Sequence, residues 1–154
     1  MRDKLRLIAS GKVATGYDML TKIALGADTC NAARAMMFAL GCIQSLQCNT
    51  DRCPTGVATQ NKHRWQSLDV PDKSMRVGNF HRRILSDFSE IVGALGLSGP
   101  DELDASHVRK YTDIGVSKSF AEIYPIAKTG ELLDSATKGV YADLWRNVKA
   151  ESFN

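Results

Sequence analysis

The sequence contains no long apolar run, no internal repeat and little net charge. None of its apolar runs approaches the roughly 20 residues that a membrane-spanning helix needs, and its N-terminal segment lacks the pattern of a signal peptide. The formal charge is only +3, with 20 Lys and Arg scattered among 17 Asp and Glu, which argues against a nucleic-acid-binding surface. We therefore expect a soluble cytoplasmic protein with no membrane or nucleic-acid partner.

Cysteine is also scarce, and the four cysteines do not suggest a disulfide framework. Because no export signal is present, reduced thiols or metal ligands are expected rather than disulfides. Hydrophobic residues make up 44% of the chain and charged residues 24%, which is typical of one globular unit. This ordinary apolar content favours a chain that folds without cross-links.

Four alternating elements are predicted in the first forty residues: a buried strand over 5–10, a helix over 16–25, a strand over 27–31 and a helix over 32–40. Thr15 precedes Asp18 by three residues, which is the spacing of a helix capping box. Gly26 suits the position just past the helix end. The alternating order of strands and helices predicts a parallel sheet.

Helical and strand periodicity both disappear between residues 41 and 69, where Cys, Asn, Thr, Pro and Gly dominate. Long ordered loops of this kind usually carry function. Asp72 is predicted to cap a long amphipathic helix that ends at Gly96. A short helix is expected after Pro100 and another over 141–153, whereas 109–130 is weakly patterned. The sequence thus predicts a functional loop followed by a helical C-terminal extension.

Three cysteines in the loop follow the pattern C-x5-C-x4-C-P, at Cys42, Cys48 and Cys53. Three thiolates on one loop can converge on a metal centre, and backbone N–H groups of such a loop can donate to sulfur. An iron–sulfur cluster is favoured over zinc, although His63 could complete a Cys3His zinc site. Unrelated buried thiols are the remaining interpretation. Cys30, in the second strand, is expected to be a packed core thiol.

Small and basic residues follow both predicted strands: Ser10, Gly11 and Lys12 after the first, Ala33 and Arg34 just beyond the second. Parallel strands end on the same side of a sheet, and helix N-termini there let backbone N–H groups approach a phosphate. In a β/α barrel the loops after the last two strands commonly form such a site. By themselves these residues are a weak signal, because Ser-Gly also forms ordinary turns and Arg34 could be a solvated charge.

Five segments together resemble the FMN-binding glutamate synthase family: IASGKV at 8–13, TGYD at 15–18, ALGAD at 24–28, ALGC at 39–42 and CPTGVATQ at 53–60. The cysteine element with its CPTGVATQ continuation is highly specific to that family, and the resemblance covers roughly residues 2 to 97. It implies the C-terminal part of a (β/α)8 TIM barrel: the last two β/α units at 1–41, an iron–sulfur loop at 42–71 and a helical extension at 72–154.

The resemblance also implies cofactors and a reaction. Ser10, Gly11, Lys12, Ala33 and Arg34 match the loops that hold the FMN phosphate, and the three loop cysteines match the ligands of a 3Fe–4S cluster. Ferredoxin or a pyridine-nucleotide-dependent subunit would supply electrons for reducing 2-iminoglutarate, formed from 2-oxoglutarate and ammonia, to L-glutamate.

The sequence departs from the family pattern in two ways. Lys12 stands where the large-subunit enzymes usually carry a second glycine, so the chain resembles the stand-alone group, and an N-methylglutamate synthase-type subunit is a further possibility. Two β/α units also cannot close an eight-stranded barrel. We therefore expect a fragment that is inactive alone, with the rest of the barrel missing or on another chain and with an unpaired strand edge. The alternative from another class is a non-catalytic, metal-stabilised module.

Overall fold

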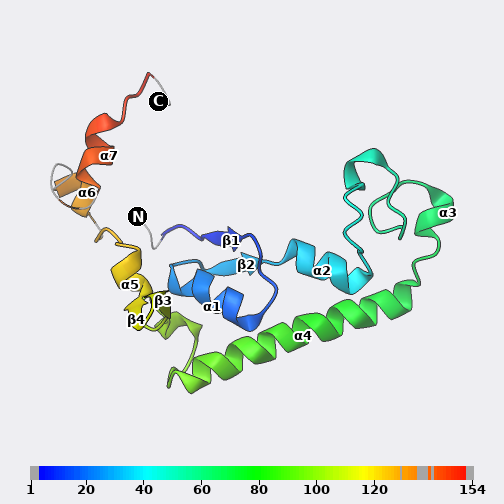
Figure 1. Ribbon diagram of the computed structural model, residues 1–154, viewed down its shortest axis with the longest axis horizontal. Helices are drawn as coiled ribbons and strands as arrows, with labels where there is room; N and C mark the ends of the chain where they lie inside the picture. Colours follow the sequence, from blue (N-terminus) through cyan, green and yellow to red (C-terminus); the bar gives the residue numbers. More distant parts are fainter. Residues whose placement is uncertain (1–3, 129, 135–138, 140, 152–154) are drawn as a thin grey trace. The chain divides into compact units, whose positions relative to one another are not determined.

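The computed structural model describes residues 4–128, 130–134, 139 and 141–151, and its fold is mixed α/β (Figure 1). The chain divides into two compact units, one over residues 6–104 and the other mainly from residue 105 onward. Within the described residues, no helix combines the length and apolarity needed to cross a membrane.

The first unit begins with a parallel pair of strands, β1 (Ile8–Ser10) and β2 (Thr29–Asn31). Ile8 pairs with Thr29 and Ser10 with Asn31, so the predicted parallel arrangement is confirmed. The prediction of a buried first strand is wrong, because the Ile8 side chain is 63% exposed. Among the described residues this sheet has only two strands, and no further strand shields that side chain.

Helix α1 (Gly16–Ala24) connects the two strands and has the predicted capping box. The Thr15 hydroxyl accepts a hydrogen bond from the Asp18 N–H at 3.1 Å, and Asp18 accepts one from the Thr15 N–H at 2.9 Å. Gly26 follows the helix in a left-handed conformation, with φ of +102°. Both helix boundaries were therefore correctly predicted from local sequence.

Helix α2 (Ala33–Leu40) follows β2 and ends at Gly41, whose φ is +110°. The segment after it was predicted to be a loop without regular structure. It contains a single 3-10 turn at Cys48–Thr50 and a short helix α3 (Lys62–Trp65), and is otherwise irregular. The loop prediction is therefore confirmed for most of its length.

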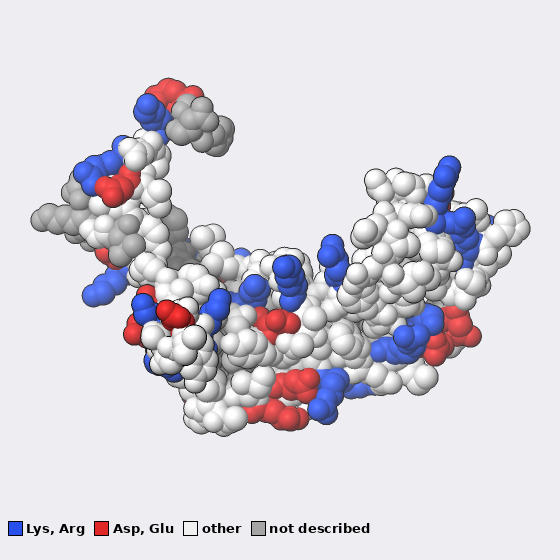
Figure 2. All heavy atoms as spheres, in the orientation of Figure 1, with Lys and Arg blue, Asp and Glu red and all other residues white. Residues whose placement is uncertain are grey.

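The long helix α4 (Val70–Ala94) packs against both α1 and α2. Its buried side chains Ile84, Phe88 and Val92 recur every fourth residue and form one face, as expected of an amphipathic helix. On the face visible in Figure 2, basic and acidic side chains are interspersed along this helix. The helix ends as predicted, with Gly96 left-handed at φ +77°.

The start of α4 differs from the prediction. Asp69, and not Asp72, is the capping residue, and its carboxylate accepts a hydrogen bond from the Asp72 N–H at 2.8 Å. Pro71 lies in the first turn, where its missing N–H removes no helical hydrogen bond. The helix therefore begins at Val70, three residues before the start that a cap at Asp72 would give. The short helix expected after Pro100 is only a 3-10 turn, Pro100–Glu102.

The second unit is not wholly helical, which corrects the predicted helical extension. Strands β3 (Arg109–Asp113) and β4 (Val116–Ser119) form an antiparallel hairpin. Gly115 has φ of +75°, as tight hairpin turns require. The weak pattern of this segment arises because almost every strand side chain is exposed, so no buried face imposes an alternation on the sequence.

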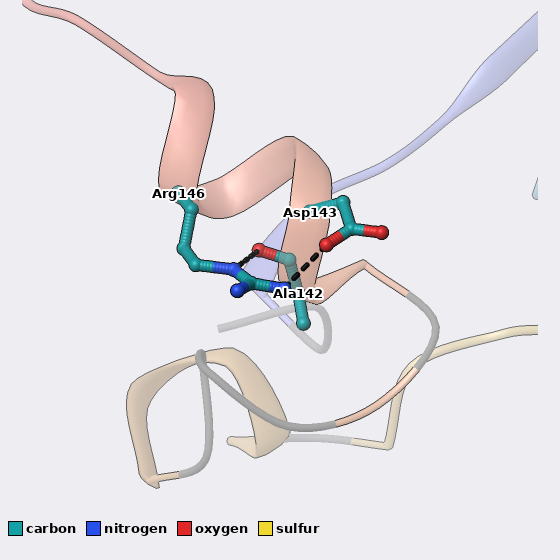
Figure 3. Close-up of polar contacts among 3 residues, drawn as sticks. All are labelled: Ala142, Asp143 and Arg146. Atoms are coloured by element: carbon teal, nitrogen blue, oxygen red, sulfur yellow. Dashed lines mark hydrogen bonds and ion pairs between the residues drawn. The ribbon is translucent and has the colours of Figure 1, made fainter.

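In the described part of the chain after the hairpin there are three short helices: α5 (Phe120–Ile123), α6 (Glu131–Asp134) and α7 (Ala142–Asn147). The ring of Phe120 is buried and meets the ring of Tyr124 edge to face, with centroids 5.4 Å apart. In α7 the Arg146 guanidinium donates to the Asp143 carboxylate and, at 3.3 Å, to the Ala142 carbonyl (Figure 3). The helix predicted over 141–153 is thus shorter, and its last two residues lie outside the described ones.

Candidate functional site

A cavity of about 450 Å³ opens at the carboxyl ends of β1 and β2. All five residues predicted to hold a phosphate line it: Ser10, Gly11, Lys12, Ala33 and Arg34. The parallel pairing of Ser10 with Asn31 places the two strand ends side by side, so the loops that follow them share one space. The predicted gathering of these residues is therefore observed.

The loop after β1 turns through two consecutive left-handed residues, Gly11 at φ +99° and Lys12 at φ +55°. A glycine adopts this conformation freely, whereas a lysine is strained in it. Strained backbone of this kind persists where its surroundings require it, often at ligand sites.

The loop after β2 leads directly into the N-terminus of α2. Ala32, its capping residue, provides no side-chain hydrogen bond, and the first turn contains no acidic residue. First-turn N–H groups lack acceptors within a helix and carry the positive end of its dipole. With Lys12 and Arg34 also lining the cavity, its described lining contains two cations and no carboxylate. This arrangement is suited to binding an anion.

Cys53 is the most buried of the three predicted iron ligands. It is 5% exposed, and its sulfur lies 3.4 Å from the Thr55 hydroxyl. The hydrogen bond with Thr55, followed by one from the Ala58 N–H, lowers the pKa of the Cys53 thiol to about 7, and burial only partly opposes this. A thiol stabilised as thiolate is the form that binds metals.

Cys42 and Cys48 are less buried than Cys53. The N–H of Cys42 donates to the Met37 carbonyl at 3.0 Å, and its sulfur accepts from the Gln44 N–H at 3.5 Å. Cys48 is exposed at the start of the 3-10 turn. Among the described residues no three His, Cys, Asp or Glu side chains lie close enough together to bind a metal, so neither a three-cysteine group nor the alternative with His63 is assembled here.

The donor set nevertheless fits an iron–sulfur ligand loop chemically. Cys42, Cys48 and Cys53 are all free thiols on one segment, and thiolates are the usual ligands of such clusters. A cavity of about 430 Å³ is lined by Cys48 and by residues 57–60, among others. Cys30 lies apart in β2 and is half-buried, so the prediction of a thiol packed in the core is wrong; burial raises the pKa of its thiol.

Sequence reasoning missed Asp51, which lies between two of the predicted ligands. Its carboxylate accepts hydrogen bonds from the Gln60 N–H at 2.6 Å and from the Thr59 hydroxyl at 3.0 Å. These two hydrogen bonds lower the pKa of Asp51 below its ordinary value. No local pattern indicates such a contact, because its partners lie eight and nine residues further along the chain.

Comparison with known proteins identifies the family. Residues 1–98 match the conserved region in glutamate synthase. The glutamate synthase large subunit-like protein YerD of Bacillus subtilis is 38% identical over 108 residues, which cover 70% of this chain and 21% of that protein. The archaeal NADPH glutamate synthase of Methanocaldococcus jannaschii is 31% identical over 131 residues, covering 85% of this chain and 26% of that protein.

The ferredoxin-dependent glutamate synthase of Pyropia yezoensis is also similar, with 32% identity over 122 residues. The match covers 77% of this chain but 8% of that enzyme. The chain belongs to the glutamate synthase family, and it corresponds to about a quarter or less of the length of these relatives.

Proposed function

We propose that this chain supplies the FMN-phosphate end and the iron–sulfur loop of a glutamate synthase-type oxidoreductase. The observation that carries the proposal is the single cavity lined by Ser10, Gly11, Lys12, Ala33 and Arg34. In this proposal β1, α1, β2 and α2 are the last two β/α units of a (β/α)8 barrel. The remaining strands come from the rest of a longer chain or from another chain, and the chain alone is inactive.

The residues of the cavity have separate tasks in holding a phosphate. Backbone N–H groups in the loop at Gly11 and at the start of α2 donate hydrogen bonds to phosphate oxygens, and the helix dipole favours their negative charge. Lys12 and Arg34 balance that charge, and a guanidinium can donate two parallel hydrogen bonds to one phosphate. Together they hold one end of the flavin in a fixed position relative to the sheet.

The loop cysteines Cys42, Cys48 and Cys53 are the proposed ligands of a 3Fe–4S cluster. When bound, FMN supplies hydride transfer and the cluster supplies one-electron transfer. The N–H groups around Cys53 would keep its sulfur charged and oriented. Cys42 is only partly buried and Cys48 is exposed, so their side chains have room to turn toward Cys53.

The reaction we propose for the complete protein is reduction of 2-iminoglutarate, formed from 2-oxoglutarate and ammonia, to L-glutamate. The names of the relatives support two classes of electron donor. Those from Pyropia and Methanocaldococcus are named for ferredoxin and NADPH respectively. Ferredoxin or a pyridine-nucleotide-dependent partner is therefore proposed here, in the cytoplasm.

Binding of FMN and riboflavin to this chain tests the phosphate assignment, because the two flavins differ only by the phosphate. FMN and inorganic phosphate should both shift the NMR amide signals of Gly11, Ala33 and Arg34, and riboflavin should not. Arg34→Ala should weaken FMN binding about tenfold or more, since a hydrogen bond to a charged group contributes roughly 1.5–3 kcal/mol.

Arg76→Ala is the matched control, because Arg76 is exposed on α4 and does not line the cavity. It should leave FMN binding unchanged. Equal responses to FMN and riboflavin at Gly11, Ala33 and Arg34 would contradict the assignment.

A further inference from the structure

Asp51 joins the two ends of a ten-residue segment within the cysteine loop. Its backbone carbonyl accepts a hydrogen bond from the Thr59 hydroxyl at 2.7 Å. Its carboxylate oxygen Oδ1 accepts from the same hydroxyl at 3.0 Å and from the Gln60 N–H at 2.6 Å. The Thr59 hydroxyl in turn accepts from the Asn61 N–H at 3.1 Å. One residue therefore ties residues 59–61 back to position 51.

Cys53 lies inside the segment that these contacts close. Its sulfur lies 3.4 Å from the hydroxyl of Thr55, within the same segment. The contacts of Asp51 with Thr59 and Gln60 therefore close a loop that contains both Cys53 and Thr55. Closing this loop limits how far the backbone around Cys53 can move.

The far side of the segment is restrained by helix α3. Gly56 is left-handed, with φ of +80°, and a Cβ there would lie 2.9 Å from the carbonyl carbon of Arg64. The Arg64 guanidinium donates to the Cys53 carbonyl at 3.4 Å. Cys53 is therefore fixed between α3 on one side and the contacts of Asp51 on the other. Cys42 and Cys48 precede Asp51 and lie outside the closed segment.

The backbone of Asp51 supports the same interpretation. Its φ of +60° places it in the left-handed region, which non-glycine residues rarely occupy and Asp tolerates better than most. Three hydrogen bonds converge on this residue, and they hold a conformation that an isolated chain would disfavour. The closure is therefore made by contacts within the loop itself.

We propose that Asp51 is the positioning residue for Cys53: it closes the segment 51–60 by binding Thr59 and Gln60 and so holds the Cys53 thiol beside the Thr55 hydroxyl. The ligand role of Cys53 rests on the proposed function, whereas its positioning by Asp51 does not. In an iron–sulfur loop, Cys53 is then the ligand whose side chain is already held in position before a cluster binds.

Two substitutions separate the hydrogen bonds of Asp51 from its charge. Asp51→Asn keeps an acceptor oxygen for Thr59 and Gln60, and Asp51→Ala removes it. In the metal-free chain, Asp51→Ala should shift the amide signals of Gln60 and also of Ala58, with faster hydrogen exchange at both, and Asp51→Asn should largely retain the wild-type positions. Asn49→Ala, an exposed neighbour in the same loop, should change neither.

Anaerobic reconstitution with iron and sulfide gives the second measurement. Asp51→Ala should lower the cluster content per chain several-fold, and Asp51→Asn should restore it, with unchanged far-UV circular dichroism showing that the helices remain folded. Wild-type Ala58 signals together with wild-type cluster content in Asp51→Ala would overturn the inference. If wild-type protein takes up no cluster while Asp51→Ala still shifts Ala58, the positioning role is supported and the proposed cluster is not.

Discussion

The backbone of Phe88 in α4 lies so close to Gly16 that a side chain at this position would overlap it. A Cβ built on Gly16 would collide with the Phe88 nitrogen and lie 2.8 Å from the carbonyl carbon of Asp87. Gly16 is the first residue of α1, so this contact sets how closely α1 approaches the long helix. The hydrophobic face of α4 is buried at the same place, through Phe88 and its neighbours.

Gly16→Ala should therefore destabilise the first unit by about 1–3 kcal/mol, the range typical of overpacking a close contact. Gly93→Ala in the same long helix is the control, because a Cβ there meets nothing within 4 Å. That change should stabilise α4 by roughly 0.5–1 kcal/mol, since alanine favours a helix. Urea unfolding measures both values, and two changes of equal sign would contradict the close contact.

Lys12 and its neighbour should respond to substitution with opposite signs. Lys12→Gly relieves a left-handed lysine and should raise the free energy of unfolding by about 1 kcal/mol, while weakening the binding of inorganic phosphate. Gly11→Ala should lower the free energy of unfolding by a similar amount, because φ is +99° although the space around it is empty. Thermal unfolding with and without phosphate measures both effects. Tighter phosphate binding by Lys12→Gly would argue against a cationic role.

The capping box of α1 predicts a dependence of stability on pH. Burial raises the pKa of Asp18, but hydrogen bonds from Ala14 and Thr15 outweigh it, and the folded-state pKa lies below the ordinary 3.8. A lowered folded pKa means that Asp18 stabilises the protein above its unfolded pKa and loses this contribution as pH falls through the folded pKa. The gap in unfolding free energy between wild type and Asp18→Asn should therefore shrink below pH ~4. A gap that stays constant with pH would contradict this.

Substitution of a loop cysteine and of Cys30 should have different effects on the iron and sulfide that the chain binds. Cys48→Ser should abolish the iron and sulfide retained after reconstitution and leave the helical circular dichroism unchanged. Cys30→Ser, outside the loop in β2, should retain both iron and sulfide. Metal analysis with visible absorption distinguishes the classes of centre, because bound zinc without iron would favour the non-catalytic module instead.

The hairpin of the second unit carries a pair of like charges. Lys110 lies directly opposite Lys118 across β3 and β4, and both are exposed. Like charges at opposed positions destabilise a strand pair, and opposite charges contribute roughly 0.2–1 kcal/mol. Lys118→Glu should therefore increase hydrogen-exchange protection in the hairpin, and added salt should reduce the gain. A salt-independent change would point to a cause other than charge.

Local sequence determined two kinds of feature. One is a contact between residues a few positions apart, and the other is the meeting of loops that follow parallel strands. The capping box formed because Thr15 and Asp18 are three residues apart, and the glycine after α1 ended the helix because only a left-handed residue fits there. The phosphate-end residues were predicted to meet because parallel strands end at one edge of a sheet. In each case the geometry follows from the spacing of nearby residues or from the direction of the strands.

The tertiary structure decided what depends on residues far apart in the chain. The exposure of Ile8 follows from the number of strands beside it, and the need for glycine at position 16 follows from a helix that begins more than fifty residues later. The positioning of Cys53 depends on Asp51 reaching forward to Thr59 and Gln60. Such contacts arise when the chain folds back on itself, so they are set by three-dimensional distance, which the spacing of residue types along a sequence does not encode.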